Sequence, residues 1–115
     1  TIKREAWGAM IQVHDNDVLE ICFTDSSLSI INAGDMLEKL KKATESSTKD
    51  IEFNMDAVTS IDSTAIAAFV KLVQHLSGTK RTITMSHVDP EIMKVLKMLK
   101  LTSFFKLKAK KAFPS

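Results

Sequence analysis

Apolar and polar residues alternate from Ile51 to Met55, and this period of two predicts a strand whose apolar run ends at Val58. The chain then passes through a short polar turn. From Thr64 to Leu76 it is mostly apolar and contains no glycine or proline, which predicts a helix. Because apolar residues cover most of the circumference of this helix, we expect it to be largely buried.

The turn between this strand and this helix is rich in hydroxyl and carboxyl groups. It holds Thr59, Ser60, Asp62 and Ser63, and Ser63 lies where the helix begins. A helix N-terminus has unpaired backbone N–H groups and the positive end of the helix dipole, so an anionic group is favoured there. Ser63 is therefore the principal candidate for a functional residue.

The same patterns predict the remaining elements. Two strands form a hairpin, because the Asp and Asn residues between them suit a tight turn. Asp89, Pro90 and Glu91 suit the start of a helix, as N-cap, first residue and first-turn carboxylate. The predicted ranges are hairpin strands Gly8–Val13 and Val18–Phe23, a helix Ile30–Thr44, a strand Arg81–Val88, a helix Pro90–Lys100 and a short strand Phe104–Leu107.

Strands alternate with helices after the hairpin, which predicts parallel pairing through right-handed crossovers. A length of 115 residues suits one domain with a single core. We therefore predict an α/β domain with a mixed sheet of four to five strands, opened by an antiparallel hairpin and packed with about three helices. Its core spans about residues 8–107, and residues 108–115 form a basic tail.

Composition narrows the possible classes of protein. The longest apolar run, residues 65–70, is far shorter than a membrane span, so no membrane insertion is expected. Cys22 is the single cysteine, which excludes an internal disulfide framework, and its place in a predicted strand indicates a small buried side chain. No secretory signal is visible, and we expect a cytoplasmic protein.

Charge is divided unevenly along the chain. Residues 1–62 hold six Lys and Arg against twelve Asp and Glu, whereas residues 63–115 hold ten against two. The uneven charge could mark a basic face that binds a partner or nucleic acid, but the spacing of Lys94, Lys97 and Lys100 favours the solvent side of a helix. Met98 on the same helix is expected to fill the core rather than to form a binding surface. Since Trp7 is the only tryptophan and tyrosine is absent, a base-stacking surface has little support and no nucleic-acid partner is expected.

The candidate chemistry of the chain is limited. Its three glycines lie far apart, which excludes a phosphate-binding P-loop, and its histidines and cysteine lack metal-ligand spacing. Ser63 lacks the glycine-flanked turn of a hydrolase nucleophile. We predict no catalytic residue, no metal and no cofactor. A serine that accepts a phosphate requires less than a catalytic serine. It needs only to be exposed, to lie at a helix N-terminus that tolerates the added charge, and to be modified by a separate kinase.

The stretch IEFNMDAVTSIDSTAIAAFVKLV resembles the central signature of the STAS domains, the family of bacterial anti-sigma factor antagonists, in which an apolar strand ends in Asp-Ser-[Ser/Thr]-Gly and enters a helix. VDPEIMKVLKMLKLTSFFKL is similar to the family's closing segment, where a Pro-led helix ends in Gly-Leu and a Phe follows, here Lys100-Leu101 and Phe105. The resemblance spans about Ala9 to Leu107. Ala65 stands where the family has glycine, and Ser29 stands for the aspartate of the loop before the first helix.

This resemblance implies a function without enzymatic activity. Ser63 corresponds to the serine that a partner anti-sigma factor kinase phosphorylates, and a phosphatase would reverse the step. Asp62 and Thr64 flank it, and Ser27 and Ser29 lie in a loop expected beside it, so these residues are the predicted partner-binding surface. STAS domains also serve in transport and sensory assemblies, so the alternative is a subunit that binds a small anion, a nucleotide or a neighbouring subunit without phosphorylation.

Overall fold

A computed structural model describes residues 4–6 and 11–110 of the chain. Its elements alternate as the sequence predicts, and three α-helices pack against one mixed sheet. In chain order they are β1 (Arg4–Ala6), β2 (Ile11–Asp15), β3 (Leu19–Phe23), β4 (Ser27–Leu28), α1 (Ala33–Glu45), β5 (Ile51–Asn54), β6 (Ser60–Ile61), α2 (Ser63–His75), β7 (Ile83–Val88), α3 (Pro90–Met98), the 3-10 turn η1 (Leu101–Ser103) and β8 (Lys106–Ala109).

The main sheet has six strands in the order β1-β2-β3-β5-β7-β8. Strands β1, β2 and β3 pair antiparallel, and β3, β5, β7 and β8 pair parallel. This confirms the predicted fold class, including the opening hairpin. The short β1, which pairs Arg4–Ala6 with Gln12–His14, brings the sheet to one strand more than predicted.

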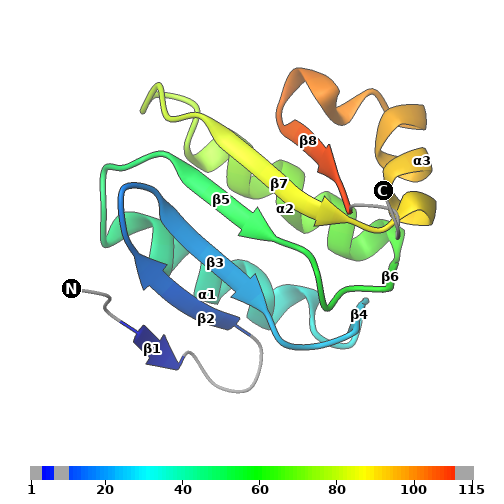
Figure 1. The fold of residues 1–115 in the computed structure, drawn as a ribbon, viewed down its shortest axis with the longest axis horizontal. Coiled ribbons are helices and arrows are strands. Elements are labelled where there is room, and N and C mark those ends of the chain that lie inside the picture. The colour runs from blue at the N-terminus through cyan, green and yellow to red at the C-terminus, as the bar shows by residue number, and fades with distance from the viewer. Residues whose placement is uncertain (1–3, 7–10, 111–115) are drawn as a thin grey trace.

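Helices α1 and α2 cover the same face of the sheet (Figure 1). Alternate residues of β2, β3, β5 and β7 point to that face and are buried, as the period of a strand requires. Phe69 of α2 lies at the centre of an aromatic cluster, with ring centroids 5.8 Å from Phe23, 5.5 Å from Phe53 and 6.3 Å from Phe105. The expectation that α2 is largely buried is confirmed on this face.

Two element boundaries, the end of β5 and the start of α1, differ from the prediction because of local side-chain hydrogen bonds. The strand at Ile51 ends at Asn54 rather than Val58, because the Asn54 side chain accepts the backbone N–H of Asp56 at 3.0 Å and turns the chain. Helix α1 begins at Ala33 rather than Ile30. The side chain of Asn32 accepts the N–H of Ser29 at 2.8 Å, which holds the preceding residues in a turn.

The C-terminal elements also differ from the prediction. Helix α3 ends at Met98, because Lys100 adopts a left-handed φ of 60° that closes the helix. The last strand is β8, Lys106–Ala109, and not Phe104–Leu107, so it extends into the range predicted as a basic tail. Residues 111–115 of that tail lie outside the described residues.

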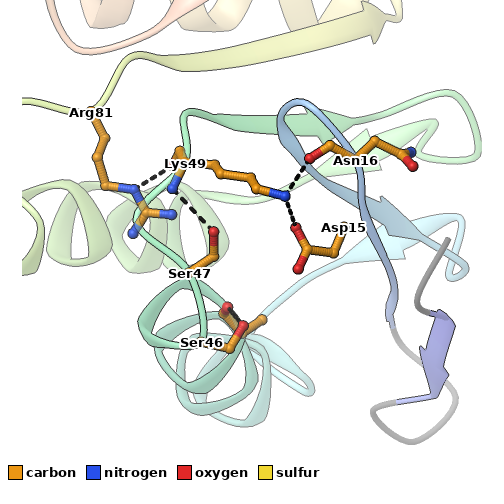
Figure 2. A network of polar contacts seen from close by, with 7 residues as sticks. Asp15, Asn16, Ser46, Ser47, Lys49 and Arg81 are labelled. Carbon is orange, nitrogen blue, oxygen red and sulfur yellow. Dashed lines mark hydrogen bonds and ion pairs between the residues drawn. The ribbon is translucent and has the colours of Figure 1, made fainter. Parts of the chain in front are cut away.

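Hydrogen bonds fasten the loops at the amino ends of the parallel strands (Figure 2). The Lys49 ammonium lies 2.7 Å from the Asp15 carboxylate and 2.6 Å from the carbonyl oxygen of Asn16, which ties the loop before β5 to the hairpin turn. The Arg81 guanidinium donates to the carbonyl oxygens of Lys49 and Thr44. These contacts hold the loops at this end of the sheet together. None of the described helices has the length and apolar character needed to cross a membrane.

Candidate functional site

Two short strands at the other end of the domain form a second sheet that the sequence did not predict. Strand β4 pairs parallel with β6, so that Ser27 lies opposite Ser60 and Leu28 opposite Ile61. The Ser60 hydroxyl donates to the Ser27 hydroxyl at 3.0 Å. This pairing joins the loop before α1 to the turn before α2. Strands of two residues are too short to show a period, which is why the pattern missed them.

Asp62 holds this junction together. It is the N-cap of α2, and its carboxylate accepts the backbone N–H of Ala65 at 2.9 Å and that of Ile30 at 2.9 Å. Its own N–H donates to the carbonyl oxygen of Leu28 at 3.0 Å. The hydrogen bond from Ala65, supported by those from Ile30 and Thr64, holds the pKa of the Asp62 carboxyl below its ordinary value. Asp62 is therefore an ionised structural link between both loops.

Ser63 and Thr64 are the first two residues of α2, and both side chains are exposed. No hydrogen bond engages the Ser63 hydroxyl within the described part of the chain, so it is open to a modifying enzyme. Ala65, which stands for the family's glycine, is buried in the first helical turn, where a right-handed conformation suits alanine well. The substitution therefore leaves the start of α2 intact.

The residues predicted in the loop before α1 divide into two groups. Ser27 is exposed beside the β4–β6 pairing. Ser29 is half-buried, and its hydroxyl accepts the N–H of Ile31 at 3.3 Å. Asn32 completes the turn by donating from its side-chain amide to the carbonyl oxygen of Ser27 at 3.0 Å. Ser29 and Asn32 thus shape the loop, whereas Ser27 faces solvent.

Two exposed residues beside the predicted partner-binding surface were not predicted from the sequence. Ile30 and Ile31 are 71% and 92% exposed, because α1 begins only after them. Ile30 is bonded through its N–H to the carboxylate of Asp62, which places the two apolar side chains next to the start of α2. Only Ile31 offered a clue in the sequence, because it lies out of phase with the buried stripe of Ala33, Met36 and Leu40, whereas Ile30 precedes Ala33 by three residues and fits the spacing of that stripe.

Shallow hollows lie on both sides of Ser63. One, of about 200 Å³, lies between β6 and α3 and is lined by Thr59, Ser60, Ile61, Glu91, Ile92 and Val95. The other, of about 140 Å³, lies between α1 and α2 and includes Thr64 and Lys71. Both are smaller than the pockets that typically bury a small-molecule ligand.

Ser63 has no histidine as a hydrogen-bonding partner among the described residues. None of the hydrogen bonds or ion pairs found for the described histidines reaches it, and His75 at the far end of α2 lies 2.8 Å from Glu45. Within the described ranges no group of three His, Cys, Asp or Glu side chains could hold a metal ion. Ser63 is thus an exposed hydroxyl at the start of α2.

A scan of family models decides the family. The model described as STAS domain matches residues 9–113, which is most of the chain. The chain belongs to the STAS domain family. No curated protein matches its sequence.

Solved structures share this STAS fold at low sequence identity. The anti-sigma-factor antagonist (STAS) domain protein of Planctomyces limnophilus has a TM-score of 0.78 and 15% identity, over 88% of this chain and 91% of that chain. The anti-sigma factor antagonist SpoIIAA in its unphosphorylated form has a TM-score of 0.59 and 12% identity, over 97% of this chain and 90% of that chain. The murine Slc26a9 anion transporter has a TM-score of 0.67 and 13% identity, over 91% of this chain but 20% of the transporter. Identities this low establish the fold alone.

Proposed function

We propose that this STAS domain is a non-enzymatic interaction module of the anti-sigma factor antagonist type, switched by phosphorylation of Ser63. The observation that carries the proposal is the exposed, unbonded Ser63 hydroxyl at the start of α2, beside the exposed Ile30 and Ile31. Apolar side chains that protrude beside a polar loop are typical of protein-binding surfaces. The module would act in the bacterial cytoplasm, in the regulation of transcription.

In the proposed complex, a kinase-type anti-sigma factor covers the start of α2. The two isoleucines supply apolar contact, and Ser27, Asp62 and Thr64 contact the partner around the modified hydroxyl of Ser63. Ser29 contributes by holding the loop in its turn. A phosphatase would restore the unmodified serine. Two similar structures support this proposal, because both are described as anti-sigma factor antagonists and one, SpoIIAA, is described as unphosphorylated.

Phosphorylation would act mainly on the interface. A phosphate adds a charge of about −1.5 to −2 at neutral pH. Asp62 already places a carboxylate at the N-terminus of α2, where it uses the N–H of Ala65. The phosphate would therefore add like charge beside Asp62 and face the bound partner, while the exposed position of Ser63 leaves the core undisturbed. Loss of about 3 kcal/mol at the interface weakens binding by a factor on the order of a hundred.

The modification is tested by mass spectrometry of the protein isolated from its own cells. We expect one phosphate in the parent, located by peptide mapping on Ser63, and none in Ser63→Ala. Thr64 is the matched control, because it is the neighbouring exposed hydroxyl on the same helical turn. Phosphate found only on Thr64, or no phosphate under any growth condition, would contradict the assignment of Ser63.

The alternative is a STAS subunit of a transport or sensory assembly that binds a small anion, a nucleotide or a neighbouring subunit. The likeness to a segment of the Slc26a9 transporter keeps it open. Against an anion at the start of α2 stands the carboxylate of Asp62, which already occupies the Ala65 N–H that the anion would use. Phosphorylation of Ser63 would favour the first proposal, since the alternative does not require it.

A further inference from the structure

Large apolar side chains are exposed where α3 ends. Met98 is 77% exposed, and Leu99 and Phe104 are 51% and 47% exposed. The core contacts of α3 are made by other residues, because Ile92, Met93 and Leu96 are buried on its inner face. The prediction that Met98 fills the core is therefore wrong. None of these three side chains belongs to the buried core cluster, and their exposure at one place calls for an explanation.

The same end of the molecule carries positive charge. Residues 92–110 contain six lysines and no acidic residue. Lys94, Lys97 and Met98 share the outer face of α3, since they are spaced three and four residues apart and all are exposed. Lys94 lies 3.6 Å from Glu91 in an exposed pair of little energetic weight, and no ion pair forms at Lys97 or Lys100 within the described residues.

These residues form one contiguous segment at the edge of the domain (Figure 1). Helix α3 passes through the left-handed Lys100 into η1, so the chain turns tightly between Met98 and Phe104. We name this segment the lysine tip and define it by six residues, Lys94, Lys97, Met98, Leu99, Lys100 and Phe104. It combines three exposed apolar side chains with three exposed lysines that are close to them in the sequence.

We propose that the lysine tip adsorbs to a membrane surface that contains anionic phospholipid. Exposed lysines next to exposed apolar side chains match a layer of anionic headgroups over hydrocarbon, where each lysine near the surface adds attraction. A specific protein interface is less well matched. Such interfaces are enriched in arginine and depleted in lysine, and every cation of the lysine tip is a lysine.

The contact would be peripheral. Met98, Leu99 and Phe104 would enter the headgroup region, while the core residues of α3 stay packed on the sheet. Val95 lines the hollow beside β6 and is not part of the lysine tip. Adsorption to a membrane goes beyond the proposed phosphorylation switch. It uses neither Ser63 nor the exposed Ile30 and Ile31 beside it.

Vesicle sedimentation tests the proposal. The probes are phosphatidylcholine vesicles with and without about a quarter of phosphatidylserine, at about 0.1 M and about 0.5 M salt. We expect the protein to pellet with the anionic vesicles at low salt and to remain in solution with phosphatidylcholine alone. The variant Lys94→Gln/Lys97→Gln/Lys100→Gln should partition on the order of a hundredfold more weakly, at about fivefold for each lysine. Met98→Ser/Leu99→Ser should lose about tenfold or more.

A matched charge control comes from other helices. Lys41→Gln/Lys42→Gln/Lys71→Gln removes the same charge from α1 and α2 and should pellet like the parent. Circular dichroism would establish that every variant is folded. The proposal is overturned if the parent stays in solution with anionic vesicles. An acidic protein would then be the better candidate for a partner of the lysine tip. The proposal is also overturned if the control loses as much binding as the tip variant, or if the Met98 and Leu99 variant binds like the parent.

Discussion

Asp62 shows how one side chain can both build a site and limit its chemistry. Its carboxylate joins the start of α2 to the loop before α1 through the N–H groups of Ala65 and Ile30. The sequence places Ser63 at the helix N-terminus and identifies the acidic neighbour. It could not show that this neighbour reaches a residue thirty-two positions away, because that contact depends on how β4 and β6 pair.

The pH dependence of stability should report this role of Asp62. A carboxyl whose pKa is lowered in the folded state stabilises the fold above its ordinary pKa of 3.8, and this contribution is lost as the pH falls through the folded value. In Asp62→Asn, which keeps an N-cap oxygen, the free energy of unfolding should be lower than in the parent at neutral pH. Denaturant titrations from pH 7 to pH 3 should show this difference narrowing, and a constant difference would contradict it.

Cys22 gives a second prediction for a single residue. Its thiol is half-buried on β3, and burial, followed by the nearby Glu20 carboxylate, raises its pKa from 9.0 to about 11. Alkylation by iodoacetamide at pH 8 should therefore be on the order of a hundredfold slower in the folded protein than in urea. Glu20→Gln should speed the reaction in the folded protein. Equal rates for folded and unfolded chains would show that the thiol is not protected.

The helices and most strands follow from periodicity, since their buried faces repeat at the spacing of each element. The boundaries that differ are set by polar side chains that compete for backbone N–H groups, as Asn32 does before α1 and Asn54 does after β5. Such competition has no period. The exposed pair Ile30 and Ile31 was missed for this reason, because a helix beginning at Ile30 had been predicted to include them.

Packing of α2 on the sheet can be tested through the aromatic cluster. Phe69→Ala should lower the free energy of unfolding by about 3 to 5 kcal/mol, because it removes a buried ring in contact with three others. The matched control is Phe104→Ala, whose half-exposed ring should lower the free energy of unfolding by only about 1 kcal/mol. If chemical denaturation gave the two variants equal stability, the assignment of α2 to the core would be wrong.

Across the whole molecule, the two ends of the parallel strands differ in character. The amino end is tied together by Lys49 and Arg81, whereas the carboxyl side leads into the start of α2 and the exposed side chains beside it. Family resemblance predicts which serine matters, and the α/β pattern predicts where it lies. Neither predicts the apolar side chains beside it or at the end of α3, because exposure is set by the tertiary packing.

Affinity for the partner tests the central claim most directly. The protein that binds Ser63→Ala in its own cells would be purified and titrated with parent, Ser63→Ala, Ser63→Asp and phosphorylated parent. We predict a kinase-type anti-sigma factor that binds the first two alike and the last two on the order of a hundredfold more weakly, with all four equally folded by circular dichroism. If the phosphorylated protein and Ser63→Asp bind this partner as tightly as the parent does, the phosphorylation switch is contradicted.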